Sequence, residues 1–124
     1  MDITPLVPAD RPLIRGYGDG GFTIRGTRWE GSILILPDEV VPWSVQTMDA
    51  FNQDSLAAVF ACTPLPEFLL VGCGPQMVLI QPQMRGAIRS AGLVVETMDT
   101  GAACRTWNVL LTEGRNAAAA LIAV

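Results

Sequence analysis

Cys73 is the residue whose type and position best fit a chemical role, because it lies between Gly72 and Gly74 directly after a short apolar run. A thiol at a turn becomes reactive when neighbouring positive charge stabilises its thiolate form. The chain has no Lys and no His, so only an Arg side chain or the N-terminus of a helix could lower the pKa of this thiol. We therefore expect Cys73 to be an inert small residue, with a reactive thiol as the alternative.

Two glycine-containing turns follow consecutive predicted strands, the first at Gly72–Pro75 and the second at Asp99–Ala103. Carboxyl ends of parallel strands meet at one edge of an α/β sheet, where ligands usually bind. Backbone amides at the start of a helix can also hold an anion. The sequence therefore predicts a crevice between these two turns for a small molecule or anion, with seven candidate residues: Gly72, Cys73, Gly74, Asp99, Thr100, Cys104 and Thr106.

Most of these residues also have a purely structural interpretation. Gly72-Cys73-Gly74 lacks the third glycine of a dinucleotide-binding motif, which would have to stand at Met77, so the glycines are expected to let the chain turn sharply. Asp99 is expected to be the N-cap of the next helix. Cys104 borders the apolar face of that helix and is expected in the core.

The absence of His and Lys from all 124 residues excludes several kinds of chemistry. Ser-His-Asp and Cys-His arrangements, His metal ligands, Schiff bases and a P-loop lysine cannot form within this chain. The three cysteines are far apart, without a Cys-x-x-Cys pair, which favours reduced thiols over a metal site or disulfides. We expect no metal and no cofactor, and a non-enzymatic role is favoured over an enzymatic one.

Composition and charge limit the partners and the location. A net charge of -4, with 50% apolar and 16% charged residues, is typical of a globular chain without a nucleic-acid surface. The longest uncharged run, residues 68–84, is interrupted by Gly and Pro, so no membrane span is predicted. The N-terminal residues show neither the apolar run of a secretory signal nor an Arg/Ser-rich presequence, so no targeting sequence is expected. We expect a cytoplasmic protein with one domain over residues 1–124, in which residues 1–12 form a loosely ordered arm.

In the N-terminal half, turn residues separate short runs that favour strands. The sequence predicts a β-hairpin across Gly18–Gly21 and one long strand whose end is buried on both faces. Trp29 and Trp43 are either exposed anchors for a partner or packed residues. The predicted elements are strands at 13–17, 22–25 and 28–36 and a short helix at 54–61.

In the C-terminal half, helical and strand patterns alternate. The predicted elements are a strand at 67–71, a helix at 82–91, a strand at 93–98, a helix from 99 to about 113 and a strand at 116–124. Met84, Ala87, Ile88 and Ala91 share one face of the first helix and are expected to contact the sheet. The last strand is rich in Ala, which fits a central position where helices approach closely. A parallel crossover over residues 67–98 then predicts an α/β fold around a mixed sheet, with an N-terminal hairpin region and a βαβαβ-like C-terminal half.

A series of short motifs resembles the Mth-domain family. They are Gly16-Tyr17-Gly18, Phe22-Thr23-Ile24, Gly72-Cys73-Gly74, Val95-Glu96, Asp99-Thr100, Ala103-Cys104, Thr106-Trp107-Asn108, Leu110, Glu113-Gly114-Arg115 and Ala119-Ala120-Leu121-Ile122. This family includes the mitochondrial NADH dehydrogenase (complex I) assembly factor 3 proteins and many uncharacterised bacterial proteins. The resemblance implies a three-layer fold on a mixed β-sheet, and a non-enzymatic assembly role with no catalytic residues to carry over. Because no import sequence is expected, the resemblance points to a bacterial cytoplasmic member of the family.

The leading functional hypothesis is therefore a protein-binding module that assists assembly of a respiratory membrane complex. The alternative is a small-molecule or anion-binding protein, enzymatic or not, that uses the crevice between Gly72–Pro75 and Asp99–Ala103. A structural homodimer is the third hypothesis.

Overall fold

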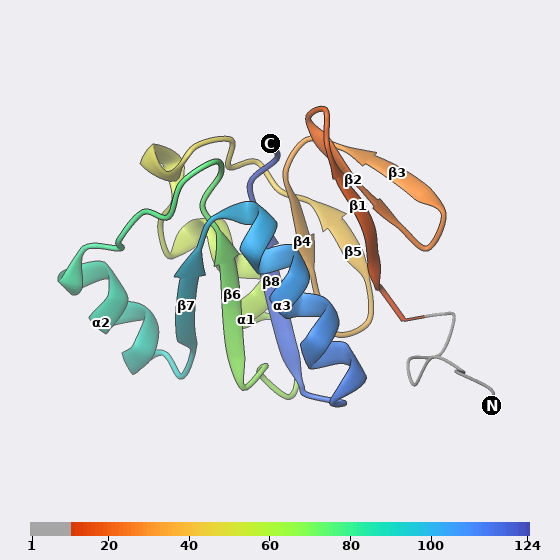
Figure 1. Cartoon of the computed structure of the whole chain (residues 1–124). Helices are drawn as coiled ribbons and strands as arrows, with labels where there is room; N and C mark the ends of the chain where they lie inside the picture. The colour runs from red at the N-terminus through yellow and green to blue at the C-terminus, as the bar shows by residue number, and fades with distance from the viewer. Residues whose placement is uncertain (1–10) are drawn as a thin grey trace.

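The larger sheet has five strands, and its central strand is the alanine-rich one. The computed structural model describes residues 11–124, so most of the arm expected at residues 1–12 lies outside the described residues. The strand order is β5-β4-β8-β6-β7, with β8 parallel to β6, β6 parallel to β7, and β4 antiparallel to both β5 and β8 (Figure 1). The bounds are β4 Ile33–Ile35, β5 Val40–Pro42, β6 Phe68–Gly72, β7 Val94–Met98 and β8 Ala117–Leu121. The mixed sheet, the parallel crossover and the central position of the last strand are confirmed.

Hydrophobic cores lie on both faces of this sheet. On one face, Ala118 and Ala120 of β8 belong to a core that also contains Leu56 and Val59. On the other face, Ala117 and Ala119 belong to a core that contains Trp107. Methyl side chains let packed elements approach the central strand closely from both sides, which explains why alanine stands in a strand despite its poor β propensity.

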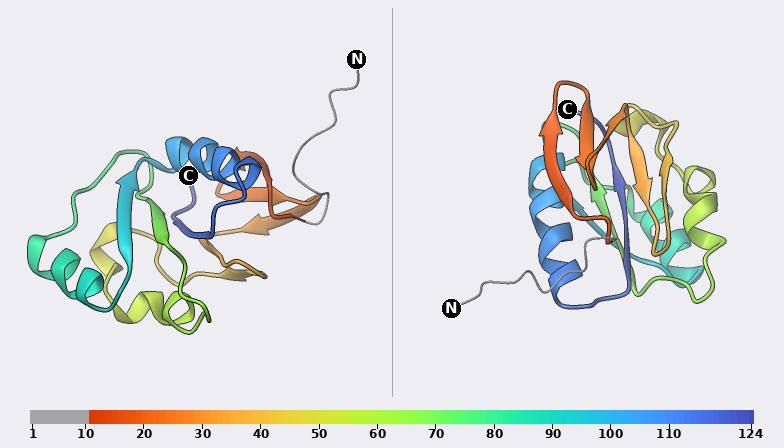
Figure 2. Two further views of the ribbon diagram at one scale, coloured as in Figure 1. Left: turned by 90° about the horizontal axis from the view of Figure 1, so that it is seen from below. Right: turned by 90° about the vertical axis from the view of Figure 1, so that its right-hand side faces the viewer.

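The helices form the outer layers. Helix α3 (Thr100–Thr112) covers one face of the sheet, and the short helix α1 (Ala57–Phe60) lies on the opposite face (Figure 2). Two 3-10 turns, η1 (Met48–Ala50) and η2 (Asp54–Leu56), accompany α1, so the helix predicted at 54–61 is divided between η2 and α1. This arrangement confirms the three-layer α/β fold.

Helix α2 (Pro82–Ser90) is less buried than its apolar pattern predicts. Ile88 is fully buried and Met84 is half-buried, but Ala87 and Ala91 are exposed. The helix packs beside the edge strand β7 instead of lying over the face of the sheet, and Nη1 of Arg85 donates to the carbonyl oxygen of Val95 at 3.2 Å. A position at the edge needs only one row of apolar residues, so the predicted four-residue sheet contact is wrong for both alanines.

The strand predicted at 28–36 is two strands in two different sheets. β3 (Thr27–Glu30) joins β1 (Ile14–Gly18) and β2 (Gly21–Ile24) in an antiparallel three-stranded sheet, whereas β4 belongs to the larger sheet. Gly31 has a φ of +80° and turns the chain after β3, and Ser32 lies between Gly31 and the first residue of β4. β4 is buried at all three positions, as expected for the apolar end of this segment.

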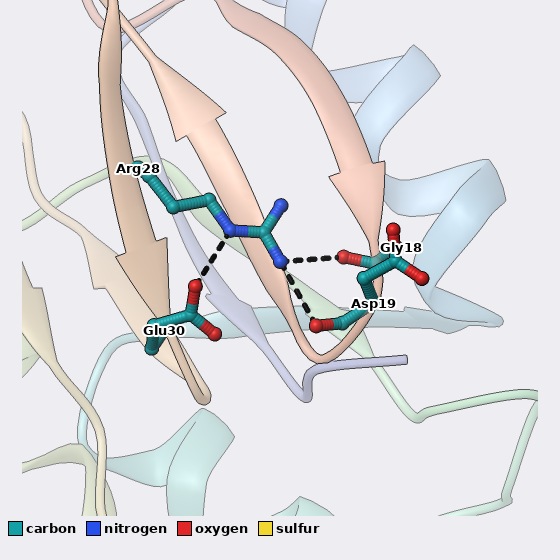
Figure 3. A network of polar contacts seen from close by, with 4 residues as sticks. All are labelled: Gly18, Asp19, Arg28 and Glu30. Atoms are coloured by element: carbon teal, nitrogen blue, oxygen red, sulfur yellow. Dashed lines mark hydrogen bonds and ion pairs between the residues drawn. The ribbon is translucent and has the colours of Figure 1, made fainter.

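Arg28 of β3 holds the turn of the predicted hairpin from across β2. Its Nη2 donates to the carbonyl oxygens of Gly18 and Asp19 at 2.8 and 2.9 Å, and its Nε pairs with Oε1 of Glu30 at 2.9 Å (Figure 3). A side chain at Gly21 would overlap the carbonyl oxygen of Trp29 and crowd the Arg28 guanidinium. Glycine at position 21 is therefore needed for this packing.

Two neighbouring residues of α3 attach the N-terminal strand to the helix. Oδ1 of Asn108 accepts from the amide of Ile14, and Nδ2 of Asn108 donates to the carbonyl oxygen of Ile14, both at 2.8 Å. Nε1 of Trp107 donates to the carbonyl oxygen of Pro12 at 2.9 Å. The Asn108 amide therefore pairs with the edge of β1 as another strand would.

The substitution Asn108→Ala is expected to lower the free energy of unfolding by about 1–3 kcal/mol, because it leaves the amide and carbonyl of Ile14 without partners. Urea unfolding followed by circular dichroism measures the loss. Asn116→Ala is the matched control, since the half-buried Asn116 side chain makes no hydrogen bond within residues 11–124. An equal effect of the two substitutions would contradict the role assigned to Asn108.

Candidate functional site

Thr100 joins the two turns that the sequence predicts to form a crevice. Its hydroxyl donates to the carbonyl oxygen of Ile122 at 2.7 Å and accepts from the amide of Gly74 at 2.9 Å. Its own amide donates to the carbonyl oxygen of Gly74 at 2.9 Å. The Thr100 side chain is fully buried, so direct hydrogen bonds occupy the place where the two turns meet.

The glycines of the first turn permit this close approach. A Cβ atom built on Gly72 would lie 3.0 Å from the Cα and Oγ1 atoms of Thr100 and from Cδ2 of Leu121. Gly74 has a φ of +103°, which residues with side chains rarely adopt. The expectation that these glycines serve a sharp turn agrees with this geometry, and the Gly72 contact adds a packing reason.

The start of α3 has few amides left for an anion. Oδ1 of Asp99 accepts from the amide of Ala102 at 2.9 Å, so Asp99 is the N-cap as predicted. The amide of Ala103 donates to the Asp99 carbonyl, and that of Thr100 is bound to Gly74. Gly101 lies against the hydroxyl of Tyr17, which would be 2.7 Å from a Cβ atom at position 101. These contacts weaken the case for an anion at this helix terminus.

The seven candidate residues do not form one cluster. The first turn, Asp99 and Thr100 lie together at the carboxyl ends of β6 and β7. Cys104 is 2% exposed and packs in the core under α3, as expected, and Thr106 is a half-buried residue further along the helix. Within residues 11–124, no hydrogen bond links Cys104 or Thr106 to the first turn.

All three thiols have raised pKa values. Burial raises the pKa of Cys73, although hydrogen bonds to the backbone of Val78 and Met98 partly oppose this shift. Burial raises the pKa of Cys104 to about 12. For Cys62, burial and then the nearby carboxylates of Asp38 and Glu39 raise the pKa. The environment of Cys73 therefore favours its neutral thiol.

Alkylation by iodoacetamide at about pH 8, just below the ordinary thiol pKa, is expected to be slower at all three cysteines than in the urea-unfolded chain. Cys104 should react most slowly, because it is buried and has the largest shift in pKa. Peptide mass spectrometry of timed samples gives the rate at each position. Rapid alkylation of Cys73 in the folded protein would instead support a reactive thiol.

Open space borders the first turn without reaching residues 99–103. A cavity of about 340 Å³ runs between residues 73–76 and the segment 46–49 and reaches Ile122. A second cavity, of about 330 Å³, shares Met48, Asp49 and Val78 with the first and continues past Leu79 to Met84. The sequence did not indicate segment 46–49 as a wall of the site, because its irregular pattern carries no motif.

Trp43 is a core residue, which excludes its interpretation as an exposed anchor. It is 6% exposed, its Nε1 donates to the carbonyl oxygen of Ser55 at 2.8 Å, and its ring packs edge-on against Phe51. Trp29 is half-buried against the core under α3. In the described part of the chain, no group of three His, Cys, Asp or Glu side chains could hold a metal, and no helix is long and apolar enough to span a membrane.

The fold defines a class of small α/β domains, with a mixed sheet, an N-terminal three-stranded sheet and two turns that Thr100 joins. The chain belongs to the family described as "Protein of unknown function (DUF498/DUF598)", which matches residues 14–122. A solved Mth938-like domain from Bordetella pertussis is similar over 99% of this chain and 89% of its own, with a TM-score of 0.77 and 27% identity. The family resemblance seen in the sequence motifs is confirmed.

Particular relatives are more similar in sequence. NADH dehydrogenase [ubiquinone] 1 alpha subcomplex assembly factor 3 of Homo sapiens is 38% identical over 114 residues, which are 92% of this chain and 62% of the human protein. The chain therefore spans less than two thirds of the length of that relative. A crystal structure described as an outer membrane protein from Bartonella henselae has a TM-score of 0.84 and 33% identity, covering 94% of this chain and 98% of that one.

Proposed function

We propose that this protein assists the assembly of a respiratory membrane complex by binding protein subunits, without catalysing a reaction. The observation that carries this proposal is the 38% identity to a protein named as a complex I assembly factor, over 92% of the chain. The relative is longer, so its role is transferred here as a proposal only. A bacterial cytoplasmic location is part of the same proposal.

The chemistry of the described residues supports a binding role. The sequence has no His or Lys, and the thiol at the first turn has a raised pKa. The buried Thr100 hydroxyl and the Gly74 amide satisfy each other, so neither is offered to a substrate. The hydroxyl and the amide that a catalytic site could present to a substrate therefore form hydrogen bonds within the fold.

Deletion of the gene in its native host tests the proposal. The amount of assembled NADH dehydrogenase, measured on native gels and as NADH:quinone activity in membranes, is expected to fall while the messenger RNAs of its subunits are unchanged. Expression of the intact chain in the deletion strain is expected to restore the assembled complex. An unchanged amount of assembled enzyme after deletion would overturn the assembly role.

A small-molecule site is the second candidate, and the cavity of about 340 Å³ beside residues 73–76 is the observation that favours it. None of residues 99–103 lines this cavity, so it is not the predicted crevice. Thermal-shift measurements with inorganic phosphate and a panel of metabolites test it, with the protein alone as reference. Stabilisation that is lost in a Gln76→Trp variant would support the site, and no stabilisation by any compound would remove it.

A further inference from the structure

The segment Met77–Gln81, which follows the first turn and leads to α2, exposes an unusual amount of apolar surface. Met77 is 51% exposed, Val78 is 41% exposed and Leu79 is 76% exposed, whereas Ile80 is buried and attaches the segment to the core. The segment runs away from the end of β6 before α2 begins (Figure 1). Three consecutive exposed apolar side chains are more typical of an interaction surface than of an ordinary loop.

The backbone of this segment is also unpaired. Met77–Gln81 runs without a turn or bend, and within residues 11–124 none of its five amides donates a hydrogen bond. An exposed stretch with free amides can pair with a strand from another protein. Strand β5, at one edge of the large sheet, offers a shorter template for pairing, because it has three residues and ends in Pro42.

The two cavities beside this segment form a groove that is mainly apolar. Six of the eight residues that line the second cavity are apolar, and both cavities share Met48, Asp49 and Val78. Asp49 is the one charged residue in the lining of either cavity, and it is exposed on η1. No ion pair within residues 11–124 engages its carboxylate.

We infer that Met77–Gln81 and the adjoining groove bind an extended apolar segment of a partner protein. A basic side chain of that segment pairs with the carboxylate of Asp49. Carbonyl groups of the partner accept from the free amides, and its apolar side chains contact Leu79 and enter the groove. Charge favours a different chain over two copies that meet groove to groove, since the groove of a second copy offers the same carboxylate and no cation. The inference rests on the proposed binding function and names its site.

Selection of random twelve-residue peptides displayed on phage, with the intact chain as target, tests the site directly. Selected peptides are expected to combine apolar residues with Arg or Lys, and their fluorescein-labelled forms give dissociation constants by polarisation. Leu79→Asp is expected to weaken binding by about tenfold or more, since it places a charge at the centre of the contact. Asp49→Asn is expected to weaken binding by about threefold.

Val109→Asp is the matched control, because Val109 is 55% exposed on α3, outside the groove. Its binding constant should equal that of the unchanged protein, and all three variants should retain the native circular dichroism spectrum. Bound peptide should also slow hydrogen exchange at the amides of Met77–Gln81. Failure to select a peptide, or selected peptides that bind Leu79→Asp and Val109→Asp equally well, would overturn the inference.

Complementation of the deletion strain separates this inference from the assembly role. If the gene is required for assembly and Leu79→Asp fails where Val109→Asp succeeds, the groove is the partner site. If both variants restore assembly fully, the assembly role stands and the groove is not its site. If sedimentation shows a dimer that Leu79→Asp dissociates, the groove binds a second copy and the assignment to a different chain is wrong.

Discussion

Replacement of Trp107 by Ala is expected to lower the free energy of unfolding by about 3–5 kcal/mol. Trp107 is 2% exposed and is among the largest fully buried side chains in the described part of the protein. It fills the core between α3, β8 and the N-terminal sheet, where Ala would leave a large void. The substitution also removes the donor to the carbonyl oxygen of Pro12, which holds the start of β1.

Urea unfolding followed by circular dichroism measures this loss, and two further variants divide it into parts. Trp107→Phe retains most of the ring volume but removes the bond to Pro12, so a loss of about 1–2 kcal/mol is expected. Trp29→Ala, at a half-buried tryptophan against the same core, is expected to cost less than Trp107→Ala. Equal losses for the two alanine variants would contradict the central role assigned to Trp107.

The substitution Thr100→Val is expected to lower the free energy of unfolding by about 2–4 kcal/mol, although it keeps the shape of the side chain. The lost hydroxyl leaves the amide of Gly74 and the carbonyl oxygen of Ile122 buried without their partner. Unsatisfied buried polar groups cost more than the mean value of one hydrogen bond. The effect should be concentrated at the joined turns, with faster hydrogen exchange at Gly74.

Thr112→Val is the control for this prediction, because the Thr112 hydroxyl binds the Val109 carbonyl on the exposed surface of α3. Water replaces that bond, so a loss below about 0.5 kcal/mol is expected. Chemical denaturation compares the two variants under one set of conditions. If Thr100→Val proves as mild as Thr112→Val, the turns are held together by packing and not by this hydroxyl.

The C-terminal half was predictable because its signals are local. A buried run followed by a capped, periodic helix identifies each strand and helix from its own residues, and the N-cap Asp99 is identified in this way. The alanine content of the last strand predicts its central position, since poor β propensity is tolerated where both faces are closely packed. In the structure this strand pairs with β4 on one side and β6 on the other. Motif resemblance added the three-layer arrangement.

Other features depend on contacts between distant parts of the chain. Segment 28–36 contains nearly continuous strand-forming residues, and only the turn at Gly31 and the separate pairing of β3 and β4 divide it between two sheets. The exposure of Ala87 and Ala91 follows from the place of α2 beside β7, which the helix's own periodicity does not specify. A pattern identifies an apolar face but not the element that covers it.

The sequence by itself determined the fold class, the order of the C-terminal elements and the exclusion of His and Lys chemistry, because composition and periodicity are properties of the chain alone. Only the tertiary structure decided that Thr100 joins the two turns and that open space lies instead beside Met48 and Val78. Hydrogen bonds and cavities of this kind arise between residues that are more than twenty positions apart. Their geometry is set by how whole elements pack, which no local pattern records.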